Sequence, residues 1–172
     1  MRPLHIAMVT ETYPPEVNGV ARTVGLMAEG LQKRGHSVQL VRPRQNGHDV
    51  AARGPRFEEI LGRGIPIPRY TQLKMGLPAK GELVRAWSER RPDIVHIATE
   101  GPLGWSALSA ARKLGLPVAT DFHTNFHAYS RHYGFAWLAS PVMVYLRRFH
   151  NRADCTLVPT AELAEELGAA GY

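Results

Sequence analysis

The stretch HIAMVTETYPPEVNGVARTVGLMAEGLQKRG, residues 5–35, contains the pattern that decides the fold. Its first six residues, 5–10, form an apolar run typical of a buried strand. Residues 19–34 then carry apolar side chains at helical spacing, namely Val20, Val24, Met27 and Leu31. Gly35 supplies the left-handed conformation that commonly ends a helix. The stretch therefore predicts a strand, a loop and a helix in that order.

The same alternation continues along the chain. Further strands are expected at residues 37–41, 93–98, 118–122 and 155–159. Helices are expected at residues 79–91, 102–114, 126–153 with a break near Ser140 and Pro141, and after Thr160 as N-cap. Residues 42–78 are expected to be a long irregular region with short strands at 57–60 and 64–67. Strands separated by helices predict an α/β fold, a Rossmann-like three-layer sandwich with a mostly parallel sheet.

Composition indicates one soluble globular domain. The chain has 172 residues, of which 44% are hydrophobic, and both charge signs are mixed through it. The single cysteine, Cys155, excludes an internal disulfide framework and is expected to pack as a small apolar side chain. No apolar run approaches the roughly 20 residues that span a bilayer, and the first residues do not resemble a signal peptide. We therefore expect a cytoplasmic protein whose membrane contact, if any, is peripheral.

Positive charge is concentrated in two regions of a chain whose formal charge is +6. Residues 42–91 hold eleven Lys and Arg against five acids, and residues 131–152 hold four Arg and no acid. Such an excess attracts phospholipid headgroups, nucleic acid or a phosphorylated substrate. Nucleic acid is disfavoured because no helix-turn-helix or RNA-binding aromatic motif accompanies the charge.

The loop after the first strand is a candidate anion site. Ligands of open parallel sheets bind beyond the carboxyl ends of the strands. Pro14 and Pro15 keep this loop extended, and Asn18 and Gly19 allow a turn that leaves the N–H groups of Gly19 and Val20 facing a phosphate. The alternative is an ordinary turn between a strand and a helix. Neither a G-x-G-x-x-G motif nor a Walker lysine is present, which disfavours nicotinamide and P-loop chemistry.

Two further loops carry polar side chains directly after strands. His123 is followed by Thr124 and Asn125, and its imidazole can bind a substrate hydroxyl or move a proton near neutral pH. Asp121 is expected to hold His123 or the backbone in place. Glu100 has two open interpretations, since it can orient a sugar hydroxyl or a basic partner, or interact with the dipole of the helix that begins at Pro102.

A metal site is disfavoured, and no metal is expected. His123 and His127 have helical spacing, and Asp121 and His132 are near them in sequence, but no Cys and no H-E-x-x-H pattern supports metal binding. The two histidines inside strands, at positions 5 and 96, are expected to be hydrogen-bonded core residues.

Residues 131–152 mix aromatic side chains with arginine and no acid, a composition that suits a membrane interface. The side chains expected to contact an anionic membrane surface are Arg131, Trp137, Arg147 and Arg148. The alternative is a core-facing helical stripe formed by Val142, Leu146 and Phe149.

Four stretches together resemble a known family. ETYPPEVNGV with its helix, VHIATEGPLG, DFHTNF and CTLVPT are similar, in this order, to the N-terminal domain of retaining glycosyltransferases of the GT-B architecture. The similarity is to family four, which includes phosphatidylinositol mannosyltransferases and sulfoquinovosyl diacylglycerol synthases. It covers nearly the whole chain.

The resemblance implies transfer of a mannose- or glucose-type hexose, with retention, from a nucleotide-diphosphate sugar to an acceptor such as a membrane glycerolipid. It implies no cofactor besides the sugar donor. The backbone at Asn18, Gly19 and Val20 would approach the donor diphosphate, Glu100 would lie on the donor side, and His123 would be catalytic. Residues expected on the acceptor side are Tyr13, Arg69, Tyr70, Lys74, Thr124, Asn125 and Tyr129.

In such enzymes the departing diphosphate itself takes the acceptor proton, which agrees with the absence of the carboxylate pair that a glycosidase needs. Family chains continue into a second domain that binds most of the donor. Residues 1–172 are therefore expected to be the N-terminal, acceptor-binding half, an excised domain or a truncated natural protein that lacks the C-terminal domain and is inactive alone. The alternative is a non-catalytic binding module for a phosphorylated ligand or a partner protein.

Overall fold

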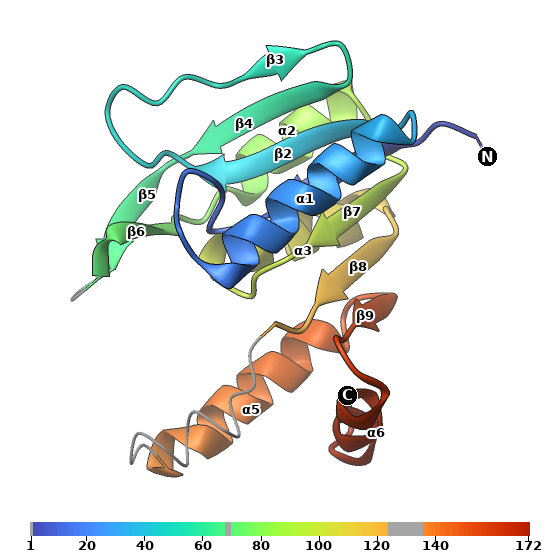
Figure 1. The fold of residues 1–172 in the computed structure, drawn as a ribbon. Helices are drawn as coiled ribbons and strands as arrows, with labels where there is room; N and C mark the ends of the chain where they lie inside the picture. Colours follow the sequence, from blue (N-terminus) through green and yellow to red (C-terminus); the bar gives the residue numbers. More distant parts are fainter. Residues whose placement is uncertain (1, 68–69, 124–135) are drawn as a thin grey trace.

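A seven-stranded sheet forms the centre of the molecule (Figure 1). The computed structural model describes residues 2–67, 70–123 and 136–172, without the side chains of residues 70–72 and 136–140. The sheet order is β3-β4-β2-β1-β7-β8-β9, and all neighbours are parallel except β3, which is antiparallel to β4. Its strands are β1 (His5–Val9), β2 (Ser37–Pro43), β3 (Arg53–Gly54), β4 (Phe57–Gly62), β7 (Ile94–Ile97), β8 (Val118–Asp121) and β9 (Cys155–Leu157).

Helices cover both faces of this sheet, as the sequence predicts. They are α1 (Gly19–Lys33), α2 (Lys80–Glu89), α3 (Pro102–Leu114), α5 (Ala136–His150) and α6 (Ala161–Ala169). Successive residues of β1 point to opposite faces. Ile6 and Met8 pack with Val24 of α1, whereas Ala7 and Val9 belong to the core that includes α2 and α3. The expected three-layer, Rossmann-like α/β fold is confirmed.

Side-chain and glycine signals fix the ends of α1. The Asn18 side chain accepts a hydrogen bond of 2.8 Å from the N–H of Ala21, which makes Asn18 the N-cap. At the other end Gly35 has φ of 91°, and its N–H bonds the carbonyl of Gln32. The helix therefore begins directly at the loop expected to bind an anion.

A buried ion network holds the segment after β2. The Arg42 guanidinium lies 2.6 Å from Asp49 and 2.9 Å from Glu59, and all three side chains are almost fully covered. The nearby Gln45 side chain donates to the carbonyl of Tyr13 at 2.7 Å. These contacts attach residues 42–49 to the loop that precedes α1.

Two strands were missed in the region expected to be irregular. These are β3 and β6 (Tyr70–Gly76), and the latter pairs with β5 (Gly64–Ile67) in a separate antiparallel hairpin. The sequence of β6, YTQLKMG, lacks an apolar alternation because this hairpin lies outside the main sheet. The expected short strands at residues 57–60 and 64–67 are present.

Two further expectations are wrong. Helix α5 continues through Pro141 instead of breaking there. Proline removes one backbone hydrogen bond, but burial of Leu146 and Phe149 holds the following turns against the core. Cys155 is exposed, because on the edge strand β9 it is Thr156 that faces inward.

None of the helices in the described ranges combines the length and apolar character that crossing a bilayer requires.

Close contact between α3 and the segment after β7 predicts a sharp glycine requirement. A Cβ at Gly104 would lie 2.1 Å from the carbonyl oxygen of Thr99 and 3.2 Å from Ile97, so Gly104→Ala must displace the helix. We expect a loss of about 1–3 kcal/mol in the free energy of unfolding, measured by urea denaturation.

Gly81→Ala is the matched control, since it makes the same substitution within α2, where no atom lies within 4 Å of the added Cβ. It should be neutral or stabilising by up to about 1 kcal/mol. Equal effects of the two substitutions would contradict the proposed close packing of α3.

Candidate functional site

The carboxyl ends of β1, β7 and β8 lie side by side at one edge of the sheet, because the three strands are parallel neighbours. Figure 1 shows β7 beside β8. The chain order reverses at β1, because β2 lies on one side of it and β7 on the other. Such a reversal is where open α/β sheets form a ligand crevice. The loops after residues 9, 97 and 121, which the sequence singled out, therefore meet at this edge.

The loop after β1 is held by its own polar side chains. The Asn18 amide donates to the Thr12 hydroxyl at 2.7 Å, and that hydroxyl donates to Glu16. Asn18 thus caps the helix with its side-chain oxygen, and Thr12 accepts one of its two side-chain N–H groups. Within the described residues no group accepts from the N–H of Gly19 or Val20, so these two amides remain available to an anion.

A groove of about 530 Å³ lies next to these amides. Its lining includes Arg22, whose exposed guanidinium supplies a positive charge one turn into α1. Sequence reasoning missed this residue, although its position three residues after Gly19 was a signal that could have found it.

Glu11 is a second residue that the sequence analysis missed. Its carboxylate accepts a 3.0 Å hydrogen bond from the N–H of Leu103 in the first turn of α3, and another from the N–H of Gly76 at the end of β6. Burial raises the pKa of Glu11, and the hydrogen bonds from the backbone oppose that increase. Glu11 therefore occupies the amino end of α3, and the idea that Glu100 does so is wrong.

Glu100 lies beside α5 instead. Its Oε1 is 3.4 Å from Nε2 of the buried His150, and its backbone carbonyl accepts a hydrogen bond from the hydroxyl of Tyr145. The side chain remains 14% exposed. Glu100 is thus fixed at the edge of the sheet and still accessible.

Asp121 bridges two histidines at the end of β8. Its Oδ1 lies 2.8 Å from Nε2 of the buried His96, and its Oδ2 lies 3.1 Å from Nε2 of His123. Burial alone raises the pKa of Asp121, but hydrogen bonds and charges from His123 and His96 outweigh it and lower the pKa to about 2. The expectation that Asp121 holds His123 is confirmed, and so is the core role of His96.

The Asp121 hydrogen bond raises the pKa of His123 above its ordinary value, and partial burial opposes this only in part. The His123 side chain is 23% exposed. Its Nδ1 has no hydrogen-bond partner among the residues that the structure describes. His123 can therefore offer a proton to a ligand at the edge of the sheet. The expectation for His5 is met only in part, because its Nδ1 lies 3.2 Å from the carbonyl of Arg91 while its buried Nε2 has no partner in that same part of the chain.

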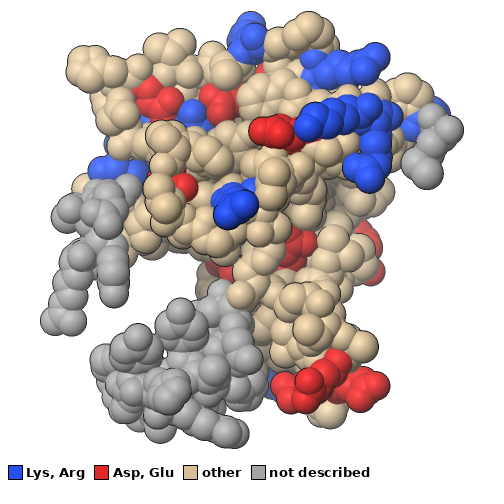
Figure 2. All heavy atoms as spheres, viewed as in Figure 1, with Lys and Arg blue, Asp and Glu red and all other residues tan. Residues whose placement is uncertain are grey.

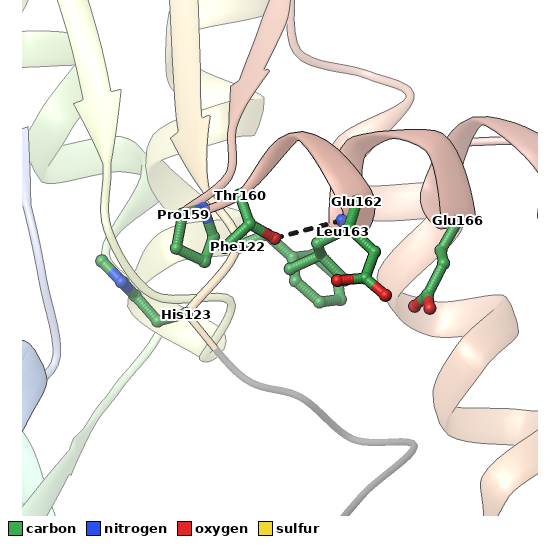
Figure 3. Close-up of a pocket in the computed structure, with 7 residues that line it drawn as sticks. All are labelled: Phe122, His123, Pro159, Thr160, Glu162, Leu163 and Glu166. Atoms are coloured by element: carbon green, nitrogen blue, oxygen red, sulfur yellow. Dashed lines mark hydrogen bonds between the residues drawn. The ribbon is translucent and has the colours of Figure 1, made fainter.

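A pocket of about 300 Å³ adjoins His123. Figure 3 shows Glu162 and Glu166 on α6 at one side and His123 at the other, with Pro159 between them. Thr160 caps α6 as expected, accepting from the N–H of Leu163 at 3.2 Å. Acidic side chains gather on α6, whereas Lys and Arg are spread over the rest of the face shown in Figure 2.

The expected acceptor residues are only partly placed. Tyr13 packs against the core on the α1 side, and Lys74 lies in β6 opposite Pro66. The backbone of Tyr70 begins β6, while its side chain is not described. Four expected acceptor residues lie outside the described residues: Arg69, Thr124, Asn125 and Tyr129.

The structure likewise describes only some of the residues expected to contact a membrane. Arg147 and Arg148 are exposed on α5, and Arg147 donates to the carbonyl of Ala170 at 3.2 Å. Arg131 and the Trp137 side chain lie outside the description. The alternative stripe is confirmed in part, since Leu146 and Phe149 are buried.

The described residues contain no group of three or more His, Cys, Asp or Glu side chains arranged to hold a metal ion.

Comparison with known proteins gives consistent results. The model of Glycosyltransferase Family 4 matches residues 17–172. A GDP-mannose-dependent alpha-mannosyltransferase of Mycobacterium tuberculosis is 33% identical over 98% of this chain and 45% of that protein. An alpha-monoglucosyldiacylglycerol synthase of Streptococcus pneumoniae is 28% identical over 95% of this chain and 37% of that protein.

Among solved structures, sucrose-phosphate synthase from Thermosynechococcus elongatus superposes with a TM-score of 0.70 at 15% identity, covering 96% of this chain and 45% of that chain. This likeness shows the fold. The chain spans under half the length of the relatives that it matches.

The bridge between Asp121 and His123 predicts a coupled titration. Asp121→Asn removes the main cause of the raised His123 pKa, so NMR titration should show that pKa falling. In the wild type, the raised pKa contributes stability that is fully present below pH 6.5, the unfolded value, and is lost as the pH rises through the folded pKa. The stability gap between the two proteins should therefore narrow at high pH. The exposed His48 provides the internal control, and an unchanged His123 pKa would contradict the bridge.

Proposed function

Because the chain belongs to Glycosyltransferase Family 4, we propose that it forms the acceptor-binding half of an enzyme that moves a hexose from a nucleotide-diphosphate sugar to an acceptor hydroxyl. The observation that carries this proposal is the position of His123. It is held by Asp121 at the same edge of the sheet as the free amides of Gly19 and Val20. A proton-bearing group and an anion site thus lie at the same edge of the sheet, beside two pockets that have no lining residue in common.

The anion site suits the diphosphate of the donor. The N–H groups of Gly19 and Val20 point out of the first turn of α1, where the helix dipole favours negative charge. Arg22 adds a positive charge in the adjoining groove, whose lining also includes the acidic Glu16 and Glu29. Negative charge grows on the diphosphate as its bond to the sugar breaks, so these donors stabilise the transition state more than the ground state.

His123 would contact the sugar or its leaving group. With Nε2 bonded to Asp121, the ring presents Nδ1 to the crevice, and the raised pKa favours the form that donates from this atom. The Asp121 carboxylate orients the ring and stabilises its positive charge. His123 is therefore placed to support departure of the diphosphate.

We propose that the transfer retains the sugar configuration without an enzymic nucleophile. Two carboxylates of the edge are engaged, since Glu11 binds backbone N–H groups and Asp121 binds two histidines. The third, Glu100, is assigned to binding a sugar hydroxyl and not to attack on the anomeric carbon. The bond from the anomeric carbon to the diphosphate breaks, and the acceptor oxygen bonds that carbon from the same side. The proton of the acceptor passes to the departing phosphate oxygen.

The proposed acceptor is a membrane glycerolipid at the cytoplasmic face of a membrane. One relative is by name an alpha-monoglucosyldiacylglycerol synthase. Helix α5 exposes 52% of Val144 and 41% of Tyr145, with the exposed Arg148 on the same side. Apolar side chains beside arginine suit an anionic lipid surface.

Replacement of His123 tests the catalytic proposal in the complete enzyme that contains this chain. His123→Ala should lower turnover of GDP-mannose or UDP-glucose with a diacylglycerol-type acceptor by about 100-fold or more. His48→Ala replaces an exposed histidine that lines neither of the two pockets of the site and should leave turnover unchanged. A wild-type protein that binds phosphorylated ligands with no transfer would instead support a binding module.

Charge reversal tests the membrane proposal. Arg148→Glu should weaken binding of the chain to vesicles that contain phosphatidylserine by about tenfold or more at low salt. Arg85→Glu, on the exposed side of α2, is the matched control and should have a smaller effect. If both substitutions act equally, α5 is not the contact surface.

A further inference from the structure

We propose that His150, a buried residue near the end of α5, positions the carboxylate of Glu100 so that one oxygen faces a hydroxyl of the donor sugar. The inference rests on the proposed function, because it assigns Glu100 to the sugar site of that reaction. His150 itself does not reach the ligand, since its side chain is only 1% exposed. It is therefore a positioning residue.

Three rings fix the plane of the His150 imidazole. The ring centroids of Phe122, Phe149 and Tyr172 lie 5.1, 5.2 and 6.1 Å from its own. Aromatic packing of this kind leaves the imidazole little freedom to rotate. The direction in which Nε2 points is thus set by the core.

Hydrogen bonding determines which nitrogen carries the proton. Nδ1 of His150 lies 2.9 Å from the hydroxyl of Thr120, which lies 2.9 Å from the hydroxyl of Thr156. If Thr156 donates to Thr120 and Thr120 donates to Nδ1, each hydroxyl proton has a short acceptor. The ring proton of the neutral imidazole is then on Nε2, facing Glu100.

The opposite tautomer is disfavoured. With the proton on Nδ1, the Thr120 hydroxyl would have to donate to Thr156 or, at 3.4 Å, to the carbonyl of Cys155. The lone pair of Nε2 would then face Oε1 of Glu100 at 3.4 Å, and both atoms are buried without a hydrogen-bond partner among the described residues. Two buried acceptors in contact are costly, so the Nε2–H form is expected.

The main chain around Glu100 is held as well. The hydroxyl of Tyr145, five residues before His150, donates to the carbonyl of Glu100, and the hydroxyl of Thr99 accepts from the N–H of Glu11 at 2.8 Å. The backbone of Glu100 is therefore anchored, and its Oε1 lies 3.4 Å from Nε2 of His150.

Only Oε2 of Glu100 remains for a ligand. Oε1 is among the buried atoms that have no partner, whereas Oε2 is not among them. No described residue donates a hydrogen bond to Oε2. A single fixed acceptor at the edge of the sheet suits one hydroxyl group. In the proposed reaction, the ligand that carries such hydroxyl groups is the transferred hexose. Loss of the His150 contact would let the carboxylate rotate and would weaken this recognition.

Two substitutions separate the hydrogen bond from the packing in the complete enzyme. His150→Phe keeps an aromatic ring among its neighbours but removes the Nε2–H, and should lower kcat/KM for the sugar donor by about tenfold or more. His150→Gln returns an amide N–H near the position of Nε2 and should recover most of that loss. His36→Gln replaces another buried histidine, at the opposite edge of the sheet, and should leave kcat/KM unchanged.

A double-mutant cycle tests whether His150 acts through Glu100. In a Glu100→Ala background, His150→Phe should change kcat/KM by less than about twofold. A further tenfold loss in that background, or no rescue by His150→Gln, would overturn the proposal and leave His150 a packing residue.

A second measurement does not depend on activity. Nitrogen-15 NMR of the chain should show a proton on Nε2 of His150, and a proton on Nδ1 alone would overturn the positioning role. If the wild-type enzyme transfers no sugar, the proposed function fails while this measurement still decides the contact between His150 and Glu100.

Discussion

The carboxylate of Glu11 is the constraint on which the edge of the sheet depends. It lies directly after β1 and binds backbone N–H groups of β6 and α3, so it joins three elements that are far apart in sequence. A Cβ at Gly101 would lie 2.1 Å from this carboxylate, which shows how closely the main chain approaches. The loop that carries Glu100 can take its path only because the amino end of α3 is already neutralised from within the protein.

The polar groups of this edge fall into two sets. Glu11 and Asp121 are satisfied by the protein itself, and they provide the framework. The amides of Gly19 and Val20, Nδ1 of His123 and Oε2 of Glu100 have no partner among the described residues. A ligand that satisfies all of them must bring both negative charge and hydroxyl groups. Nucleotide-diphosphate sugars, the donors of the proposed reaction, have both.

The sequence predicted the parts of this structure that depend on local pattern. The sheet, α1 with its caps, and α3 from Pro102 to Leu114 follow from apolar spacing and from Asn18 and Gly35. Residues whose role depends on distant partners were not predictable in this way. Glu11 follows β1 closely in the sequence but binds backbone N–H groups that lie 65 and 92 positions later. Strand β6 forms only because β5 lies beside it. Pro141 was expected to break α5, and packing further along the helix decided otherwise.

Asp121 divides its two oxygens between an interior and a peripheral imidazole, which links the core of the protein to acidity at its surface. If the residue at position 96 lost its ability to donate, Oδ1 would be freed and Oδ2 would attract the proton of the outer ring more strongly, although the change lies in the core. Relatives that work at different pH would thus differ in the residue at this buried position of β7. The pH optimum would then depend on buried side chains behind the crevice as well as on those that line it.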